Sequence, residues 1–125
     1  MTASTTDAPV VPDWVRDMYA KVDAGMVDEY IDLFADGAVL RFGSSEPVLG
    51  KEAIGARLKA ADSGHALHHT CRNCWQADDT TILEFDVAYH YDDGTSSHFP
   101  AITLLQRADG LITSMRVYAS PAPAA

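Results

Sequence analysis

Three side chains suited to acid–base chemistry, Glu84, Asp86 and His90, occupy alternate positions in one stretch of the sequence. The stretch, residues 80–91, is rich in β-branched and aromatic residues and is typical of a β-strand. Alternate residues of a strand share one face, so these three side chains are predicted to project together. The other face carries leucine, phenylalanine, valine and tyrosine and is apolar enough to require burial.

A histidine on the preceding predicted strand gives Asp86 a candidate partner. The two strands are joined through a turn at the aspartates 78–79. Pairing Trp75 with Thr80 across this turn places His69 opposite Asp86. In an apolar cavity such a pair is a usable acid–base unit, because the carboxylate orients the ring and holds a proton on it. The alternatives are a purely structural hydrogen bond, or an Asp86 that stays solvated.

A C-x-x-C motif at Cys71 and Cys74 suggests a redox or zinc site, but its predicted place on a strand argues against both. Residues three apart on a strand point to opposite faces, and a redox C-x-x-C normally opens a helix. A zinc site would need two further ligands at fitting positions. We interpret the cysteines as small buried hydrophobes and predict no metal. Since the sequence has no glycine-rich phosphate loop, we also predict no cofactor.

The elements that must position these residues change character halfway along the chain. Helical spacing of apolar residues predicts helices over 14–22, 27–34 and 51–61, with a short strand at 38–42 between the last two. Four strands joined by turns follow, at 68–76, 80–91, 96–107 and 111–118. Helices segregated from hairpins predict an α+β domain over 13–120, with helices on one face of the sheet. Residues 1–12 and 121–125 are predicted to be tails.

Composition limits the partners. The chain has 125 residues and a formal net charge of −9, which disfavours nucleic acid and anionic membranes as partners. No apolar run approaches the roughly 20 residues of a membrane helix. Two cysteines and no recognisable secretory signal predict a cytoplasmic protein with free thiols.

Five short motifs, in their order and spacing, resemble the nuclear-transport-factor-2-like superfamily. They are YAKVDAG (19–25), LFADGAV (33–39), SEPVLGKEAI (45–54), HH (68–69) and DGLITSMRVY (109–118). The resemblance spans about residues 13–120 and includes scytalone dehydratase, ketosteroid isomerase, limonene epoxide hydrolase and SnoaL-type polyketide cyclases. It implies a cone-like α+β barrel, in which three N-terminal helices pack on a curved, mainly antiparallel sheet around an apolar pocket.

The resemblance also assigns the two faces of the sheet. In this superfamily the convex face commonly forms a homodimer interface, which leaves Glu84, Asp86 and His90 on the concave, pocket side. A small hydrophobic molecule is the ligand that such a pocket implies. The predicted pocket-lining residues are Trp14, Tyr19, Leu40, Phe42, Trp75, Ala88, His90, Phe99, Ala101, Thr103, Met115 and Val117.

Of the catalytic acids of ketosteroid isomerase and limonene epoxide hydrolase, only one is matched by an acidic residue in this sequence. The base of ketosteroid isomerase falls on Phe42. Its second carboxylic acid, which an apolar site keeps protonated, falls on Ile102 or Thr103. Since none of these residues is acidic, that chemistry is not expected. Of five catalytic positions of limonene epoxide hydrolase, only one aspartate is matched, by Asp86, while its arginine has become Glu84.

Three functions follow from this pattern. The first is a cofactor-independent isomerase, cyclase, dehydratase or hydrolase for a small hydrophobic substrate, with Asp86 as base, His69 as partner and Glu84 beside them. The second is a non-catalytic domain that binds a hydrophobic ligand, which the missing acids favour. The third is a dimerisation module.

Overall fold

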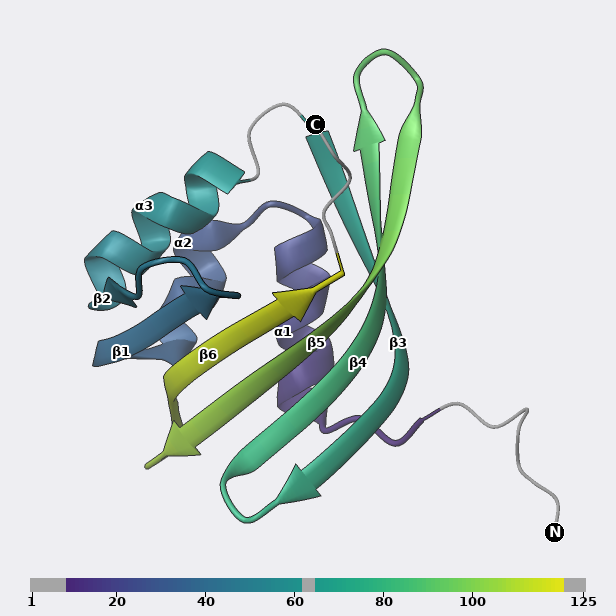
Figure 1. Cartoon of the computed structure of the whole chain (residues 1–125). Coiled ribbons are helices and arrows are strands. Elements are labelled where there is room, and N and C mark those ends of the chain that lie inside the picture. The colour runs from purple at the N-terminus through teal and green to yellow at the C-terminus, as the bar shows by residue number, and fades with distance from the viewer. Residues whose placement is uncertain (1–8, 62–64, 121–125) are drawn as a thin grey trace, which may run out of the picture.

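The computed structural model describes residues 9–61 and 65–120, and within them it forms helices on one side of a sheet (Figure 1). In chain order the elements are α1 (Asp13–Asp23), α2 (Val27–Tyr30), the 3-10 helix η1 (Ile31–Leu33), β1 (Phe34–Phe42), β2 (Val48–Leu49), α3 (Lys51–Ala61), β3 (His65–Ala77), β4 (Thr80–Tyr91), β5 (Ser96–Ala108) and β6 (Leu111–Ala119). The predicted tails, 1–12 and 121–125, lie outside the described residues except for 9–12.

The strands form one curved sheet in the order β2-β1-β6-β5-β4-β3, and the helices cover its concave face (Figure 1). Neighbouring strands are antiparallel except β1 and β6, which run parallel. Because β2 and β3 stay at opposite edges, the sheet curls around the helices without closing. The predicted α+β fold, three helices on a curved and mainly antiparallel sheet, is confirmed.

Helix α1 forms because its apolar residues recur at helical spacing, and Val15, Met18 and Val22 are buried against the sheet. The helix ends at Asp23. Gly25 follows with a φ of 72°, a left-handed conformation that glycine adopts without strain. This stop leaves the Asp23 side chain on the last turn of α1, beside β3.

Side chains from both layers fill the centre of the molecule. The largest fully buried ones are Met18, Phe34, Leu40, Ile54, Leu83, Leu105 and Ile112. They come from helices α1 and α3 and from strands β1, β4, β5 and β6. The middle of the concavity is therefore a packed core, and the pocket beside α1 lies toward the β3 edge.

A β-bulge in β3 decides which of its residues face the helices. Cys71 stands opposite Phe85, whereas Asn73 stands opposite Glu84, so two steps along β3 match one step along β4. Arg72 is the extra residue. Since side chains alternate between faces, one extra residue reverses the facing of every residue on its far side.

The register predicted from the sequence is wrong for this reason. The hairpin closes with Ala77 opposite Thr80, and beyond the bulge His69 stands opposite Val87 rather than Asp86. Val87 is buried on the helix side of the sheet. The imidazole and the Asp86 carboxylate therefore lie on opposite faces.

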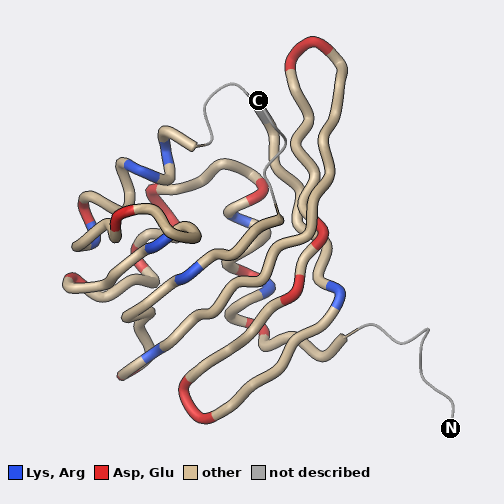
Figure 2. Tube along the Cα trace, viewed as in Figure 1, with Lys and Arg blue, Asp and Glu red and all other residues tan. Residues whose placement is uncertain are grey.

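Charged residues are spread over helices and strands, and acidic residues mark the β3–β4 and β4–β5 turns (Figure 2). These turns carry Asp78–Asp79 and Asp92–Asp93. Among the described helices, none has the length and apolar character needed to cross a membrane.

Deletion of Arg72 tests the role of the bulge. Without the extra residue, the part of β3 that carries His69 and Cys71 must turn these half-buried side chains outward or lose its pairing with β4. We expect the deletion to lower the free energy of unfolding by at least about 2 kcal/mol in urea titrations. Arg72→Ala keeps the bulge and removes only an exposed ion pair, so its cost is expected to stay below about 1 kcal/mol. Equal effects of the two changes would contradict this role.

Candidate functional site

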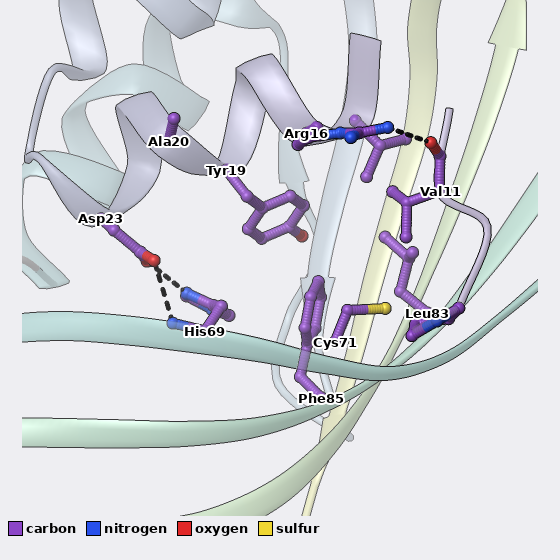
Figure 3. A pocket seen from close by; sticks show the side chains of 11 residues that line it. Val11, Arg16, Tyr19, Ala20, Asp23, His69, Cys71, Leu83 and Phe85 are labelled. Carbon is purple, nitrogen blue, oxygen red and sulfur yellow. Dashed lines mark hydrogen bonds and ion pairs between the residues drawn. The ribbon is translucent and has the colours of Figure 1, made fainter. Parts of the chain in front are cut away.

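One apolar pocket of about 410 Å³ lies between α1, the segment before it and the β3–β4 edge of the sheet (Figure 3). Its lining residues are Pro9, Val11, Val15, Arg16, Tyr19, Ala20, Asp23, His69, Cys71, Leu83 and Phe85. The volume is within the range of small-molecule sites, and mostly apolar walls with a few polar groups are typical of them.

Asp23 and His69 form a hydrogen-bonded pair at one end of this pocket (Figure 3). The Asp23 Oδ1 lies 2.6 Å from the His69 Nδ1, and the His69 backbone N–H donates to Oδ2 at 3.0 Å. The exposed fractions of the two side chains are only 14% for His69 and 20% for Asp23. Two-point attachment fixes the carboxylate against β3. In the neutral ring this carboxylate holds the proton on Nδ1 and leaves Nε2 as a base.

A second imidazole approaches the same carboxylate from outside. The His68 Nδ1 lies 3.7 Å from the Asp23 Oδ2, and the His68 side chain is 64% exposed. Asp23 thus stands between a half-buried imidazole that lines the pocket and an exposed one in contact with solvent.

Tyr19 lies next to this pair and supplies a buried hydroxyl. Its ring centroid is 4.9 Å from that of His69 and 4.7 Å from that of Phe85. The Tyr19 Oη is buried and has no hydrogen-bond partner of good geometry among the described residues. Burial raises the pKa of Tyr19 far above its ordinary value, and this effect outweighs the lowering by the nearby Thr103 hydroxyl. The phenol is therefore a neutral donor, and an oxygen atom of a ligand would satisfy it.

The two cysteines occupy the same face, contrary to the prediction. Cys71 stands opposite Phe85 and Cys74 opposite Leu83, because the bulge inserts one residue between them. Burial raises the pKa of both thiols, so Cys71 forms part of an apolar wall and is a poor nucleophile. No cluster of three or more metal-ligating side chains occurs in residues 9–61 and 65–120.

The predicted acids lie outside the pocket. Asp86 forms an exposed ion pair with Arg72, and Glu84 accepts a hydrogen bond of 2.6 Å from the Asn73 side chain. Both stand on the outer, convex face of the sheet. The predicted contact between His69 and Asp86 is wrong because the bulge turns them apart.

The face predicted to form a dimer interface is instead the one that packs against the helices. Leu83, Phe85 and Val87 are almost fully buried in the core. The faces of β4 were thus assigned the wrong way round, since an apolar strand face of this kind can be buried by helices as well as by a second copy.

Of the twelve predicted pocket-lining residues, Tyr19 lies in the wall of this pocket, and so does His69, which was predicted as a catalytic partner of Asp86. Four others are buried in the core, namely Leu40, Ala101, Thr103 and Met115. Another four are half-buried against it, namely Trp14, Phe42, Phe99 and Val117. The remaining three, Trp75, Ala88 and His90, lie on the outer face by their register with β4 and β5. The centre of the concavity is packed, which is why the inward-facing residues of β1, β5 and β6 do not reach the pocket.

Sequence reasoning missed Asp23 and Arg16. Asp23 entered the sequence analysis only within the motif YAKVDAG (19–25), although it follows Tyr19 by four residues and so shares its side of α1. Arg16 precedes Tyr19 by three residues on the same side. A polar residue in register with a buried aromatic residue was the signal available.

Comparisons with known proteins agree on the fold. A sequence profile of the SnoaL-like domain family matches residues 15–115. A search of curated protein sequences gives no significant match.

Several solved structures share the architecture at low sequence identity. A Catenulispora acidiphila protein with a ketosteroid isomerase-like fold, in complex with trimethylamine, is 22% identical over 87% of this chain and 86% of its own, with a TM-score of 0.77. A limonene epoxide hydrolase-like epoxide hydrolase of Mycobacterium tuberculosis is 14% identical over 85% and 79%, with a TM-score of 0.75. Another M. tuberculosis protein, in complex with estradiol-17β-hemisuccinate, is 24% identical over 82% and 88%, with a TM-score of 0.72. Likeness at this level shows the fold alone.

Alkaline unfolding tests the environment of Tyr19. Burial raises the pKa of this phenol above its ordinary value near 10, so the folded state keeps its proton where the unfolded chain loses it. The stability that this residue contributes is complete below about pH 10 and is lost as the pH rises further. We expect Tyr19→Phe to lose less unfolding free energy than the unmodified protein between about pH 9 and about pH 11 in urea titrations. Tyr118→Phe, at a residue that is 46% exposed, is the control and should follow the unmodified protein. Identical pH profiles for Tyr19→Phe and the unmodified protein would refute the assignment.

Proposed function

Since this chain belongs to the SnoaL-like domain family, we propose that it is an acid–base enzyme for a small, largely apolar molecule bound between α1, β3 and β4. The observation that carries the proposal is the hydrogen-bonded Asp23–His69 pair in the pocket wall, with the Tyr19 ring packed beside it. These groups face a pocket with apolar walls, where proton transfer and hydrogen bonding are less screened than in water.

Each group has a role that its contacts support. His69 takes a proton from the substrate through Nε2, because its Nδ1 is engaged by the Asp23 carboxylate at 2.6 Å. Asp23 is a positioning residue that fixes the ring orientation and offsets the positive charge formed on it. Tyr19 donates a hydrogen bond to the oxygen that becomes negative as the proton leaves. His68 on the solvent side of Asp23 supports proton exchange with water after each turnover.

The reaction that fits these groups best is removal of a proton from a carbon next to a carbonyl group. The base and the oxyanion donor then act on one enolate, and the proton is returned by the imidazolium. Isomerisation, cyclisation and dehydration can all begin with this step. Two neighbours of the same fold are described in complex with small molecules, trimethylamine in one and a steroid hemisuccinate in the other, which supports a ligand-binding use of the fold.

Exchange of α-protons tests this proposal without the natural substrate. We expect the protein to accelerate deuterium exchange into 2-tetralone in D₂O, followed by proton NMR. His69→Gln and Asp23→Asn should each lower the rate by about 10²-fold, the usual size of a general-base contribution. Tyr19→Phe should lower it by about tenfold, through loss of an oxyanion donor. Asp86→Asn, a matched carboxylate change on the outer face, should leave the rate unchanged.

Three results would count against the assignment. They are no acceleration by the unmodified protein, a rate that depends on Asp86 but not on Asp23, and a rate unaffected by loss of the His69 ring. The one-dimensional NMR spectrum of each variant verifies that it is folded.

We further propose that two copies pair through the outer face of the sheet. Trp75 and Tyr118 lie there with exposed fractions of 51% and 46%. Trp75 pairs with Ile82 on β4, and Ile82 with Leu104 on β5, so three apolar residues adjoin across three strands before the row reaches Arg116 on β6. A charge in the middle of such a surface would oppose its burial.

Sedimentation velocity tests the pairing. We expect the unmodified protein to sediment as a dimer and Trp75→Glu to shift it to the monomer, since the substitution places a carboxylate in the apolar row. Leu49→Glu, another exposed apolar position but on the opposite edge strand, should remain dimeric. A monomeric unmodified protein would refute this proposal while leaving the pocket chemistry unaffected.

A further inference from the structure

Arg16 is the positively charged residue of the pocket wall, at the end opposite to the Asp23–His69 pair (Figure 3). Arg16, Ala20 and Asp23 follow one another at spacings of four and three residues, which places them on one side of α1. All three line the pocket. A rise of about 1.5 Å per residue separates the first and the last by roughly 10 Å along the helix axis.

The guanidinium group keeps unused donors. Its Nη2 donates to the Val11 carbonyl at 2.9 Å and to the Asp13 Oδ1 at 3.3 Å. No described residue accepts a hydrogen bond from its Nε or Nη1. The Asp13 carboxylate is 96% exposed and the Arg16 side chain 67% exposed, so their attraction is strongly screened by water. The Nε and Nη1 groups of Arg16 can therefore donate hydrogen bonds to a further acceptor.

The wall between the two polar ends is apolar. Val11, Val15, Leu83 and Phe85 line the same pocket as Arg16 and the imidazole. A molecule that uses the whole pocket must therefore have an apolar body, a reacting group at the Asp23–His69 end and an acceptor at the other end. A carboxylate matches the planar fork of an arginine in shape and in charge.

We propose that the pocket selects an apolar molecule carrying a carboxylate, which Arg16 binds while the reacting carbon lies beside His69. This inference deepens the proposed function and rests on it for the identity of the reacting end. The net charge of −9 disfavours anions in general, so a preference for a carboxylate would have to come from a local contact such as this one.

The contact also accounts for the place of the segment before α1. Arg16 donates a hydrogen bond to the Val11 carbonyl, and both Val11 and Pro9 line the pocket. A carboxylate bound to Nε and Nη1 of the guanidinium would leave the hydrogen bond to Val11 intact. The segment then serves as the wall that covers the carboxylate end of the ligand.

Binding of two ligands that differ only in charge tests the inference. We expect biphenyl-4-carboxylate to bind about five- to tenfold more tightly than biphenyl-4-carboxamide in calorimetric titrations at low salt, the range of a partly exposed charge-assisted contact. In Arg16→Gln the preference should fall to near one, and Arg16→Lys, which keeps the charge without the fork, should be intermediate. The preference of the unmodified protein should shrink at high salt.

Arg41→Gln is the matched control. Arg41 is likewise exposed and donates to a backbone carbonyl, that of Ser45 at 3.0 Å, but it does not line the pocket. Its removal changes the net charge by the same amount. The carboxylate preference should therefore persist in Arg41→Gln.

The outcomes separate this inference from the proposed reaction. Equal binding of both compounds to the unmodified protein, or a preference that survives in Arg16→Gln, overturns the inference even if His69 proves catalytic. A preference that depends on Arg16, found together with an absence of proton exchange, supports the inference and overturns the enzymatic proposal. Binding of neither compound overturns both.

Discussion

The extra residue in β3 is the constraint on which the site depends. Arg72 stands between Cys71, opposite Phe85, and Asn73, opposite Glu84. On the turn side of the bulge, β3 keeps the facing that simple alternation assigns. On the other side the facing is reversed, and this turns His69 toward the helices. Without the bulge the His69 imidazole would point outward, away from Asp23 at the end of α1.

Helix α1 supplies the complementary half of the site. Its end at Asp23 brings the carboxylate to the edge of β3, where one oxygen meets the His69 ring and the other meets the His69 backbone N–H. The same side of the helix carries Tyr19, and one turn earlier Arg16. One helix thus presents a cation, a phenol and a carboxylate in a row to a pocket whose other wall is apolar sheet. Rigid secondary structure holds these groups, which favours precise placement over adaptability.

The buried hydroxyl of Tyr19 lowers the stability of the fold but is available for binding a ligand under the proposed function. A buried hydroxyl without a partner costs roughly 1–3 kcal/mol relative to a satisfied one. The rest of the molecule compensates through a closely packed core in which Met18, Leu40 and Ile54 are fully buried. Under the proposed function, a hydrogen bond from the Tyr19 hydroxyl to an oxygen atom of the ligand would recover this free energy. The packed centre and the open β3 edge therefore belong to one arrangement, in which the core secures the fold and the edge keeps room for chemistry.

The sequence by itself determined the elements and their general arrangement. Helical spacing identified α1 and α3, and the aspartate-rich turns delimited β3, β4, β5 and β6 close to where the structure has them. The helix predicted over 27–34 is shorter, because α2 ends at Tyr30, η1 follows it, and β1 begins at Phe34. Tyr19 was predicted as a pocket residue and lies in the pocket wall, whereas His69 lies there without its predicted partner Asp86. These features follow from local periodicity and turn chemistry, which a single sequence displays directly.

Only the tertiary structure decided which face of β3 and which face of β4 point toward the helices. That in turn decided which side chains can take part in the candidate chemistry. The bulge at Arg72 carries no glycine or proline to mark it, so alternation seemed to continue and placed His69 beside Asp86. The actual partner of His69 is Asp23, which is 46 residues away in the sequence. The two residues come together because α1 packs on β3. Period-two alternation is a local property, whereas the facing of a strand depends on every residue inserted along its pairing. For that reason the sequence showed that acid and imidazole were present, and the fold determined which pair meets.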